Sequence, residues 1–313
     1  MIILRVSFII PVYNPDSTIK NILKCIKLYS LQYENEVETI VIDSSSNDYS
    51  TQFLKQEDIK LIKIKKSQFN HGGTRNKAFL LSKGEFVIFL TQDAIPVNVQ
   101  SFVNLLKNMQ KNPSIGMSYG RQLPKKNADF FGGFARRFNY PDKSIIKSMA
   151  DRKTLGIKTV FASNSFAGYR ASALRSVGGF PTNTILSEET YVAARMIKQG
   201  WSIAYEADAC VYHSHNYTCL QEFKRYFDTG VFYGRESWIL NTFSKAEGEG
   251  AKFATTQLLS ILKRGKIYLI PSFFLRNLMK YLGYKLGIYE KFIPLLIKQK
   301  ITMNKQFWKK KKK

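Results

Sequence analysis

Two patterns of apolar and polar positions alternate in the first half of the chain. Runs rich in Val, Ile and Phe, typical of buried strands, occur at "RVSFIIPVYN", which we expect to break at Pro11, and at "VETIVIDSSS", "IKLIKIK" and "EFVIFL". Between them, "DSTIKNILKCIKL" predicts a helix capped by Asp16 or Ser17, and "TRNKAFLLSKG" predicts a short helix closed by Gly84. This alternation predicts a mostly parallel α/β sheet covered by helices on both faces.

The second half of the chain is less regular. Helical patterns occur at residues 101–112 and 188–200, and "WSIAYEADACVYH" is typical of a strand that ends at His213. From about residue 240 the pattern becomes helical, basic and aromatic. We therefore expect an α/β domain over residues 1–238 and a helical, basic C-terminal region over residues 239–313.

Polar side chains follow three of the predicted parallel strands. Tyr13 and Asn14 follow the first strand, Asp43 ends the second, and Gln92 and Asp93 follow the fourth. In open parallel sheets the ligand crevice lies beyond the carboxyl ends of the strands. These five side chains are therefore expected to face one candidate site.

Composition narrows the class of protein. The 313 residues are 44% hydrophobic and 14% aromatic, which is enough for a core and excludes a wholly disordered chain. Three scattered cysteines predict neither a disulfide framework nor a zinc site and suit a cytosolic protein. "MIILRVSFIIPVYN" favours a first strand over a signal peptide, and no apolar run reaches the about 18 residues that span a bilayer. We expect a protein that is soluble or lies on a membrane surface.

Positive charge is concentrated in the C-terminal region. The chain has a net charge of +25, and residues 241–313 hold 17 basic and 3 acidic residues, ending in five lysines at residues 309–313. Nucleic-acid binding is one interpretation of such charge, and a packing appendage with a solvated basic face is another. "YLIPSFFLRNLMKYLGYKLGIYEKFIPLLI" is too apolar for a nucleic-acid arm and favours an interfacial helix on an anionic membrane.

Asp93 and Asp43 each allow two interpretations. An acid that ends a buried strand, as Asp93 does, can cap the next helix or pair with a lysine. It can also bind Mg²⁺, which proteins hold with one or two carboxylates and substrate phosphates. Asp43 lies in "IDSSSND", which is good turn chemistry, and its functional alternative is a hydrogen bond to a nucleotide base.

Three other groups are candidates for chemistry. "FNHGGTRNKA" is either a simple turn before a helix or a segment in which Arg75 meets phosphate. Glu188 and Glu189 begin a helix, where acids favourably meet the dipole, or one of them is a general base. His213, with His215 close behind, is either structural or completes a cation shell begun by Asp93.

Six segments in order resemble the family 2 inverting glycosyltransferases of the GT-A fold. They are "SFIIPVYN", "IVIDSSSND", "FNHGGTRN", "FLTQDAIP", "SEETYVAARMIKQGWSIAY" and "ACVYHS". "FNHGGTRN" and "TQDA" are similar to the bacterial rhamnosyltransferase branch, which uses dTDP-L-rhamnose. The resemblance implies a GT-A nucleotide-diphospho-sugar transferase fold that moves a sugar to a saccharide acceptor in surface polysaccharide synthesis. With the membrane interpretation of the C-terminal region, we also expect a lipid-linked acceptor and a location on the cytoplasmic, inner face of the cell membrane.

The resemblance implies a role for each candidate residue. Asp93 matches the last acid of the family's Asp-x-Asp metal motif and would hold Mg²⁺ or Mn²⁺ with His213. Glu188 and Glu189 align with the family's Glu-Asp pair, given Arg195, so that Glu189 takes the general-base position. The residues implied in nucleotide-sugar binding are Pro11, Tyr13, Asn14, Asp43, Arg75, Gln92 and Asp93.

The chain departs from the family pattern at two positions. Thr91 stands where the first acid of Asp-x-Asp is expected, so metal binding rests on fewer carboxylates. The usual catalytic Asp is Glu189, one methylene longer, which moves the acceptor slightly.

Other functions are ranked lower. A transferase with a different nucleotide-sugar donor is the nearest alternative. A sugar nucleotidyltransferase would carry its glycine-rich loop directly after the first strand, where this chain has "PVYN". A nucleic-acid-binding protein is supported by charge alone, so no nucleic-acid partner is expected.

Overall fold

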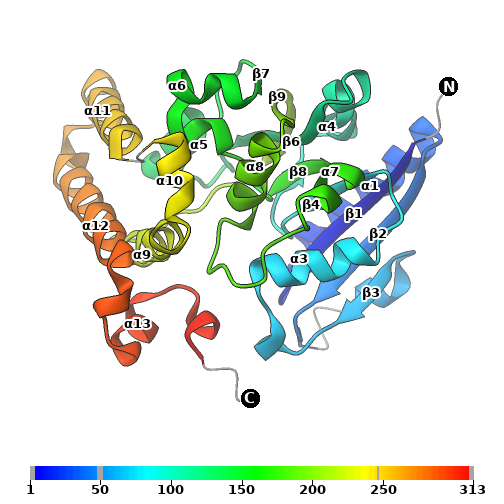
Figure 1. Ribbon diagram of the computed structural model, residues 1–313, viewed down its shortest axis with the longest axis horizontal. Coiled ribbons are helices and arrows are strands. Elements are labelled where there is room, and N and C mark those ends of the chain that lie inside the picture. The colour runs from blue at the N-terminus through cyan, green and yellow to red at the C-terminus, as the bar shows by residue number, and fades with distance from the viewer. Residues whose placement is uncertain (1–3, 48–51, 245–246, 310–313) are drawn as a thin grey trace.

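One nine-stranded sheet runs through the described residues, 4–47, 52–244 and 247–309, of this computed structural model. The strand order is β3-β2-β1-β4-β8-β6-β9-β5, and β7 pairs with β9. Helices lie on both faces of the sheet, and the last helices form a separate edge of the molecule (Figure 1). The last four residues of the C-terminal lysine run, 310–313, lie outside the described residues.

The N-terminal half of the sheet is parallel, as the sequence predicts. It consists of β1 (Arg5–Val12), β2 (Glu36–Asp43), β3 (Lys60–Lys63) and β4 (Phe86–Leu90). The expectation that the first strand breaks at Pro11 is wrong, because β1 continues to Val12 and Pro11 pairs with Ile42. The β1–β4 pairing stops at Ile9, so Pro11 lies where β1 has a hydrogen-bonded neighbour on one side, and its missing N–H costs little.

The other half of the sheet is mixed. β8 (Phe166–Arg170) is antiparallel to both β4 and β6 (Ile115–Leu123), and β9 (Ser202–Tyr212) is parallel to β6. The short strands β5 (Ile95–Pro96) and β7 (Ile145–Lys147) pair antiparallel with β9. The sequence pattern did not reveal β6 and β8, because both carry a buried glycine in place of an apolar side chain. A Cβ on Gly120 would lie 2.4 Å from the Phe166 ring.

Alternate residues of β1 enter different cores. Phe8 and Ile10 pack with α1 (Thr18–Tyr33) and α4 (Gln100–Lys111). Ile9 packs with helices of the opposite face, α3 (His71–Leu80), α7 (Ala171–Ser176) and α8 (Glu188–Lys198). This alternation confirms the prediction of a sheet covered on both faces.

The helix expected from Thr74 to Gly84 begins and ends earlier. The side chain of Asn70 caps α3 by accepting a 2.8 Å hydrogen bond from the Gly73 N–H. Gly84 is not its cap. A Cβ there would lie 2.6 Å from the Ser7 backbone nitrogen, so close approach to β1 is what requires glycine at this position.

The C-terminal region is helical, as predicted, and packs against the end of the α/β unit. It contains α10 (Ser237–Phe243), α11 (Glu247–Lys263), α12 (Ile270–Ile288) and α13 (Leu295–Ile301). α12 lies along α9 (Cys219–Arg235), and Trp308 joins the main core beside Phe227. The division of the chain at residues 238 and 239 stays a prediction.

A buried aspartate of α9 binds residues 302–304 of the C-terminal region. Asp228 accepts hydrogen bonds from the Thr302 hydroxyl, the backbone N–H groups of Met303 and Asn304, and the Asn304 side-chain amide. The remaining amide oxygen of Asn304 lies 3.1 Å from His71 Nε2 at the start of α3. The C-terminal segment therefore reaches back to the α/β unit.

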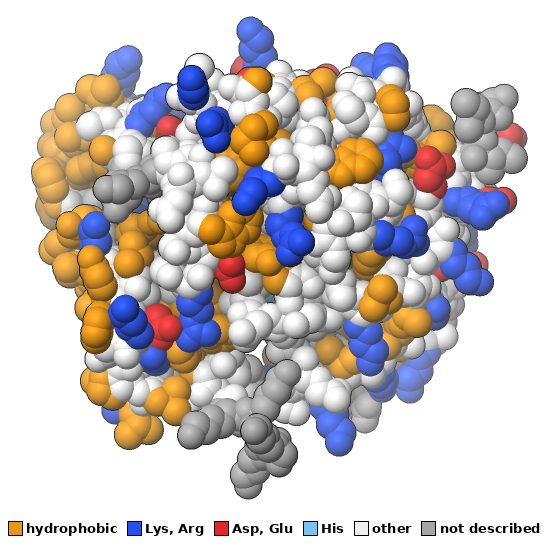
Figure 2. Space-filling view, viewed as in Figure 1, with side chains coloured by type: hydrophobic (Ala, Val, Ile, Leu, Met, Phe, Trp, Pro, Cys, Tyr) orange, Lys and Arg blue, Asp and Glu red, His pale blue; other side chains and the backbone are white. Residues whose placement is uncertain are grey.

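Many large apolar side chains of the C-terminal helices are exposed. On α12 they recur at helical spacing along one face, and Figure 2 shows apolar side chains gathered at the left, where Figure 1 places α11 to α13. These α12 residues are Phe274, Leu275, Leu278, Tyr281, Leu282 and Leu286. Among the helices of the described residues, none is both long and apolar enough to cross a membrane.

Glycine contacts between α9 and α12 should control the stability of the C-terminal region. A Cβ on Gly287 would lie 2.1 Å from the Phe227 carbonyl oxygen, so we expect Gly287→Ala to lower the free energy of unfolding by about 1–3 kcal/mol. A Cβ on exposed Gly250 of α11 would meet no described atom within 4 Å, so Gly250→Ala should leave stability unchanged or raise it by up to about 1 kcal/mol. Denaturant unfolding measures both, and equal stability of the two variants would contradict the expectation.

Candidate active site

The strand ends converge as the sequence predicts, and side chains join them. Gln92, two residues beyond β4, holds the backbone of Tyr13 after β1. Its Oε1 accepts from the Tyr13 N–H at 2.8 Å, and its Nε2 donates to the Tyr13 carbonyl at 3.1 Å. The Tyr13 ring is 41% exposed and lies under the Lys66 ammonium, 4.2 Å from it. Gln92 thus orders the rim of the crevice.

One carboxylate oxygen of Asp43, at the end of β2, forms hydrogen bonds within the adjoining turn. Its Oδ1 accepts from the backbone N–H and the hydroxyl of Ser46, and the same hydroxyl accepts from the Asn14 N–H. Asn14 takes a left-handed conformation with φ of 44°. The buried Oδ2 of Asp43 has no hydrogen-bond partner among the described residues. Both interpretations of Asp43 fit, since one oxygen builds the turn and the other is left for a ligand.

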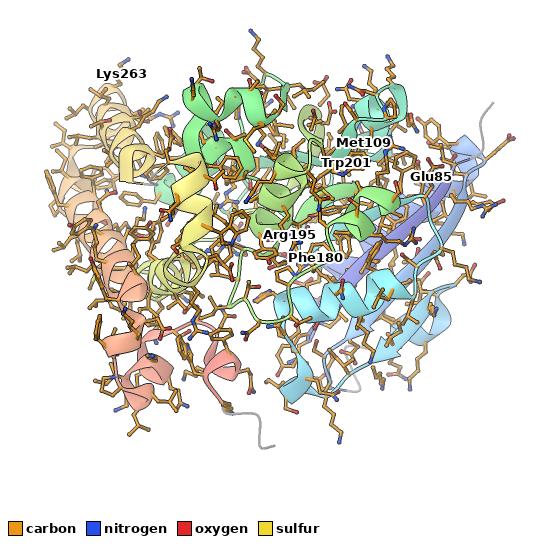
Figure 3. All side chains as sticks on the ribbon, viewed as in Figure 1. Glu85, Met109, Phe180, Arg195, Trp201 and Lys263 are labelled. Atoms are coloured by element: carbon orange, nitrogen blue, oxygen red, sulfur yellow. The ribbon has the colours of Figure 1, made fainter. Side chains whose placement is uncertain are left out.

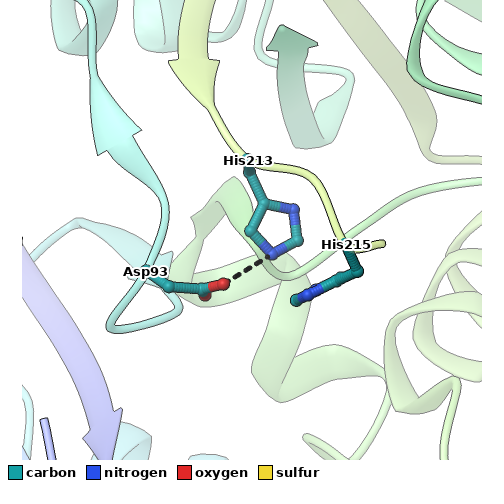
Figure 4. A group of neighbouring side chains, drawn as sticks. All are labelled: Asp93, His213 and His215. Carbon is teal, nitrogen blue, oxygen red and sulfur yellow. Dashed lines mark ion pairs between the residues drawn. The ribbon is translucent and has the colours of Figure 1, made fainter. Parts of the chain in front are cut away.

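Asp93, His213 and His215 come together at the ends of β4 and β9. Each offers one ligand atom, and these atoms lie within 4.8 Å of one another. Figure 4 shows the two imidazoles on the same side of the Asp93 carboxylate. The predicted pairing of Asp93 with His213 is present, and His215 is an addition that the sequence left undecided. A carboxylate and two imidazoles suit Mn²⁺ and similar cations.

Hydrogen bonds assign the tautomer of His213. Its Nδ1 lies 2.9 Å from Gln122 Oε1, while Gln122 Nε2 donates to the Ser163 hydroxyl at 2.9 Å. Nδ1 is therefore the donor, and in the neutral ring Nε2 presents a lone pair to Asp93 Oδ2, 3.4 Å away. Two acceptors at this distance repel each other unless a proton or a cation lies between them.

Burial disfavours protonation of His213. It lowers the pKa of His213, although Asp93 acts to raise it, and burial with the neighbouring His213 lowers the pKa of His215 to about 4. Burial would raise the pKa of Asp93, but His213 and Lys125 outweigh it and hold that pKa well below its usual range. Near neutral pH the cluster is an anionic carboxylate with neutral imidazoles, which are the protonation states that bind a divalent cation.

Lys125 is the basic neighbour of this cluster. Its Nζ lies 3.5 Å from Asp93 Oδ2, so the alternative role of Asp93 as a lysine partner is also realised. The Thr91 hydroxyl is buried without a hydrogen-bond partner among the described residues. Thr91 therefore leaves an oxygen where the family pattern has its first acid.

Glu188 forms a buried ion pair at the start of α8. Its Oε1 lies 3.0 Å from Arg75 Nη1 and accepts from Asn164 Nδ2 at 3.0 Å. Burial would raise the pKa of Glu188, but Arg75, His71 and Asn164 outweigh it and lower that pKa. The Tyr169 hydroxyl in turn donates to Asn164 at 2.6 Å. Glu188 is thus held ionised by three side chains, and Tyr169 orients one of them, Asn164.

Glu189, the next residue, has the opposite electrostatic environment. It is half-buried in the first turn of α8, and its pKa is raised to about 8 by burial and by the neighbouring charge of Glu188. A carboxyl group whose pKa lies near the working pH can accept a proton efficiently. The pKa values of the two adjacent acids therefore differ: Glu188 is an ionised partner of Arg75, and Glu189 is a basic carboxylate.

Residues 163–165 connect the two halves of the site. Ser163 bonds to Gln122, which orients His213, whereas Asn164 bonds to Glu188. The backbone carbonyl of Ser165 accepts from the Thr91 N–H. No sequence signal pointed to Gln122, Asn164 or Lys125, because their contacts are long-range and their surroundings carry no motif.

Three arginines have different relations to the candidate site. Arg195, seven residues after Glu188, is exposed and contacts Tyr191 on its own helix (Figure 3). Arg75 is buried against Glu188, so a contact with the nucleotide stays a prediction. Arg225 of α9 acts electrostatically on both His215 and Glu189, whose pKa values it lowers.

Comparison with known proteins agrees with this geometry. The sequence profile described as "Glycosyl transferase family 2" matches residues 7–178. The O-antigen chain rhamnosyltransferase RfbN of Salmonella typhimurium is 43% identical over 307 residues, which cover 97% of this chain and 96% of that protein. The O-antigen chain rhamnosyltransferase WbaN of Salmonella anatum is 43% identical over 303 residues, which cover 96% and 95%.

Solved structures share the fold at low identity. The mannosyltransferase PcManGT from Pyrobaculum calidifontis, in complex with GDP-Man and Mn²⁺, has a TM-score of 0.60 at 15% identity, over 93% of this chain and 89% of that chain. TarS 1-349 from S. aureus has a TM-score of 0.51 at 14% identity, over 92% and 91%.

Fold and site together define a nucleotide-sugar transferase of the GT-A class. The chain belongs to glycosyl transferase family 2 and is a glycosyltransferase of polysaccharide synthesis.

Removing the charge of Asp93 should weaken cation binding. Asp93→Asn keeps the shape of the side chain, and we expect the affinity for Mn²⁺ in the presence of dTDP to fall by more than about tenfold, the loss typical even of outer-shell partners. Asp208→Asn, at an exposed position on β9, is the matched control and should bind Mn²⁺ normally. Free Mn²⁺ measured by electron paramagnetic resonance reports both, and unchanged binding by Asp93→Asn would remove it from the ligand set.

Proposed function

We propose that the chain transfers L-rhamnose from dTDP-L-rhamnose to a lipid-linked saccharide acceptor, with inversion at the anomeric carbon. The observation that carries this proposal is the 43% identity, over nearly the full length of both chains, to O-antigen chain rhamnosyltransferases. The separated protonation behaviour of Glu188 and Glu189 supports an inverting step, which needs one general base.

The donor lies in the crevice at the carboxyl ends of β1, β2 and β4. The unpaired Oδ2 of Asp43 is placed to accept a hydrogen bond from the nucleotide base, and Pro11, Tyr13 and Asn14 frame the base and ribose. Gln92 orders this frame through the backbone of Tyr13. Arg75 stabilises the nucleotide side of the site through the start of α3.

Asp93 and His213, with His215, are the residues that would hold Mg²⁺ or Mn²⁺. When bound, the cation offsets the negative charge that develops on the departing diphosphate. Gln122 keeps the Nε2 lone pair of His213 turned toward Asp93, which orients the ligand atom before the cation arrives.

Glu189 acts as the general base. Its carboxylate takes the proton from an acceptor hydroxyl, whose oxygen forms a bond to the anomeric carbon as the bond from that carbon to the diphosphate oxygen breaks. The products are the rhamnosylated acceptor, dTDP and a protonated Glu189. Glu188 stays ionised on Arg75 and positions the first turn of α8 while it raises the basicity of its neighbour.

The exposed apolar face of α12 lies on an anionic membrane surface, at the inner face of the cell membrane. Apolar rings and branched side chains line this face, and Lys285 lies on the same helix. Such a helix buries its apolar face at the headgroup boundary, with basic groups near the lipid phosphates. A membrane position would bring a lipid-linked acceptor to the site.

Replacing the proposed base should abolish transfer while sparing donor binding. Glu189→Gln keeps the size of the side chain but cannot take a proton, so we expect kcat to fall by about 10²- to 10⁴-fold. Binding of dTDP-L-rhamnose, measured by calorimetry, should stay near that of the wild type. A Glu189→Gln enzyme with near-normal turnover would exclude Glu189 as the base.

The pH dependence of kcat should follow the ionisation of Glu189. Because its pKa is raised to about 8 and the base acts when deprotonated, kcat should rise with pH up to about 8 and level off above it. Glu188→Gln removes the neighbouring negative charge and should move this rise to lower pH. The exposed Glu85→Gln is the matched control (Figure 3). An identical profile in the wild type and Glu188→Gln would contradict this coupling.

The membrane proposal predicts salt-sensitive binding to anionic vesicles. Leu278→Ser on α12 should weaken binding to phosphatidylglycerol vesicles in a flotation assay, because it removes an exposed apolar side chain from the proposed contact face. Leu80→Ser replaces a leucine that is 72% exposed on α3 and should bind as the wild type does. Equal binding by both variants would count against α12 as the contact.

A further inference from the structure

A basic pocket lies between α5 (Phe130–Asn139) and the turn that joins α11 to α12. Its volume is about 340 Å³. Lys125 and Asp129 line it from the loop after β6, Arg137 from α5, and Arg264 and Lys266 from the α11–α12 turn. Arg264 and Lys266 lie outside the family match at residues 7–178, so the C-terminal region supplies two of the four cationic side chains of the pocket.

The chain neutralises only part of the positive charge of this pocket, because Lys125 pairs with Asp93 and Asp129 is the acidic residue among the lining side chains. Within the described part of the chain, Arg137, Arg264 and Lys266 form no ion pair, whereas Asp129 is occupied as the N-cap of α5, accepting from the Gly132 N–H at 2.6 Å. Partial burial and the nearby guanidinium of Arg264 lower the pKa of Arg137. Four cationic side chains against one lining carboxylate leave an excess of positive charge, which favours an anion between them.

One end of the pocket adjoins the candidate cation site. Lys125 lines the pocket, and its Nζ lies 3.5 Å from Asp93 Oδ2. The loop that carries it is fastened to the segment after β9, because Lys125 N–H donates to the Ser214 hydroxyl and Asp129 N–H donates to Asn216 Oδ1. The pocket is therefore held in place relative to His213 and His215.

The other end adjoins the exposed apolar surface. Leu262, Ile267 and Tyr268 flank the two basic residues of the α11–α12 turn and are 50%, 63% and 73% exposed. Lys263, at the end of α11, marks this turn at the upper left of Figure 3, above the apolar side of the molecule in Figure 2. Positive charge thus lies between an apolar surface and the reacting groups.

We propose that this pocket binds the diphosphate of an amphiphile that carries the acceptor saccharide on an apolar chain. The ligand class follows from the three surfaces that lie next to one another. Exposed apolar residues suit the apolar chain of the ligand, four cationic side chains suit clustered negative charge, and the adjoining catalytic crevice suits the sugar. Several cations suit a diphosphate better than a singly charged headgroup, because each added charge-assisted hydrogen bond strengthens binding. The proposal rests on the proposed function for the identity of the attached sugar.

The donor diphosphate has a different place. It is assigned to Asp93 and the histidines, at the carboxyl ends of β4 and β9, whereas Arg264 and Lys266 belong to the C-terminal helices. Lys125 lies between these two positions and can neutralise charge on either side. Filling the donor site with dTDP therefore leaves the basic pocket free for an experiment.

The test is binding of farnesyl diphosphate to the full chain, by calorimetry, with saturating dTDP and Mn²⁺. We expect the wild type to bind farnesyl diphosphate more tightly than farnesol, and Arg137→Ala with Arg264→Ala to weaken it by about tenfold or more. Lys126→Ala with Lys263→Ala removes the same charge from residues that do not line the pocket and should leave binding unchanged. The affinity for dTDP should be equal in all three proteins.

Several outcomes would overturn the proposal. The proposal is wrong if the wild type does not bind farnesyl diphosphate. It is also wrong if the Arg137 and Arg264 variant retains this binding, or if the control pair loses it to the same extent. Loss of phosphatidylglycerol vesicle binding in the same proportion would instead identify a general phospholipid contact. These readouts involve no sugar transfer, so a failure of the rhamnosyltransferase assignment would appear separately, as absence of turnover with dTDP-L-rhamnose.

Discussion

The site depends on the side-chain amide of Gln122. Its carbonyl oxygen accepts from His213 Nδ1 and from Arg136, and its amide nitrogen donates to Ser163. These bonds leave His213 Nε2 unprotonated toward Asp93, and through residues 163–165 they join the cation side to the side of Glu188. A buried amide with its partners satisfied is rigid, so the ligand atoms are oriented before any ligand binds.

Adjacent acids in one helical turn acquire different chemistry from their surroundings. Glu188 faces Arg75 and is held ionised, whereas Glu189 forms no ion pair with any residue that the structure describes and its pKa is raised by burial and by the charge of Glu188. The helix dipole, which favours acids at this position, acts on both and cannot separate them. Burial and one guanidinium make the difference, which is the general way in which one fold assigns an acid and a base.

The C-terminal region contacts residues of the candidate site and also carries an exposed apolar surface. Asp228 and Asn304 fasten the end of the chain to His71, close to Arg75 and Glu188. The same region supplies Arg264 and Lys266 to the basic pocket beside Asp93. The exposed apolar region and the candidate site are thus connected through direct contacts.

Sequence alone determined the parallel strands, the helices on both faces and the polar residues at the strand ends. These follow from local periodicity and from the rule that strand ends share one edge of a sheet. Position along the chain located Asp93, Asp43, Glu189 and His213, and the family resemblance supplied the functional role expected of each.

Only the tertiary structure showed which residues far apart in the sequence come into contact. It joined Arg75 to Glu188, placed Lys125 and His215 at Asp93, inserted β8 antiparallel into the sheet, and brought Arg137 to Arg264. Hydrogen bonds and Coulomb interactions act over a few ångströms, and no local pattern records which distant residues meet at that range.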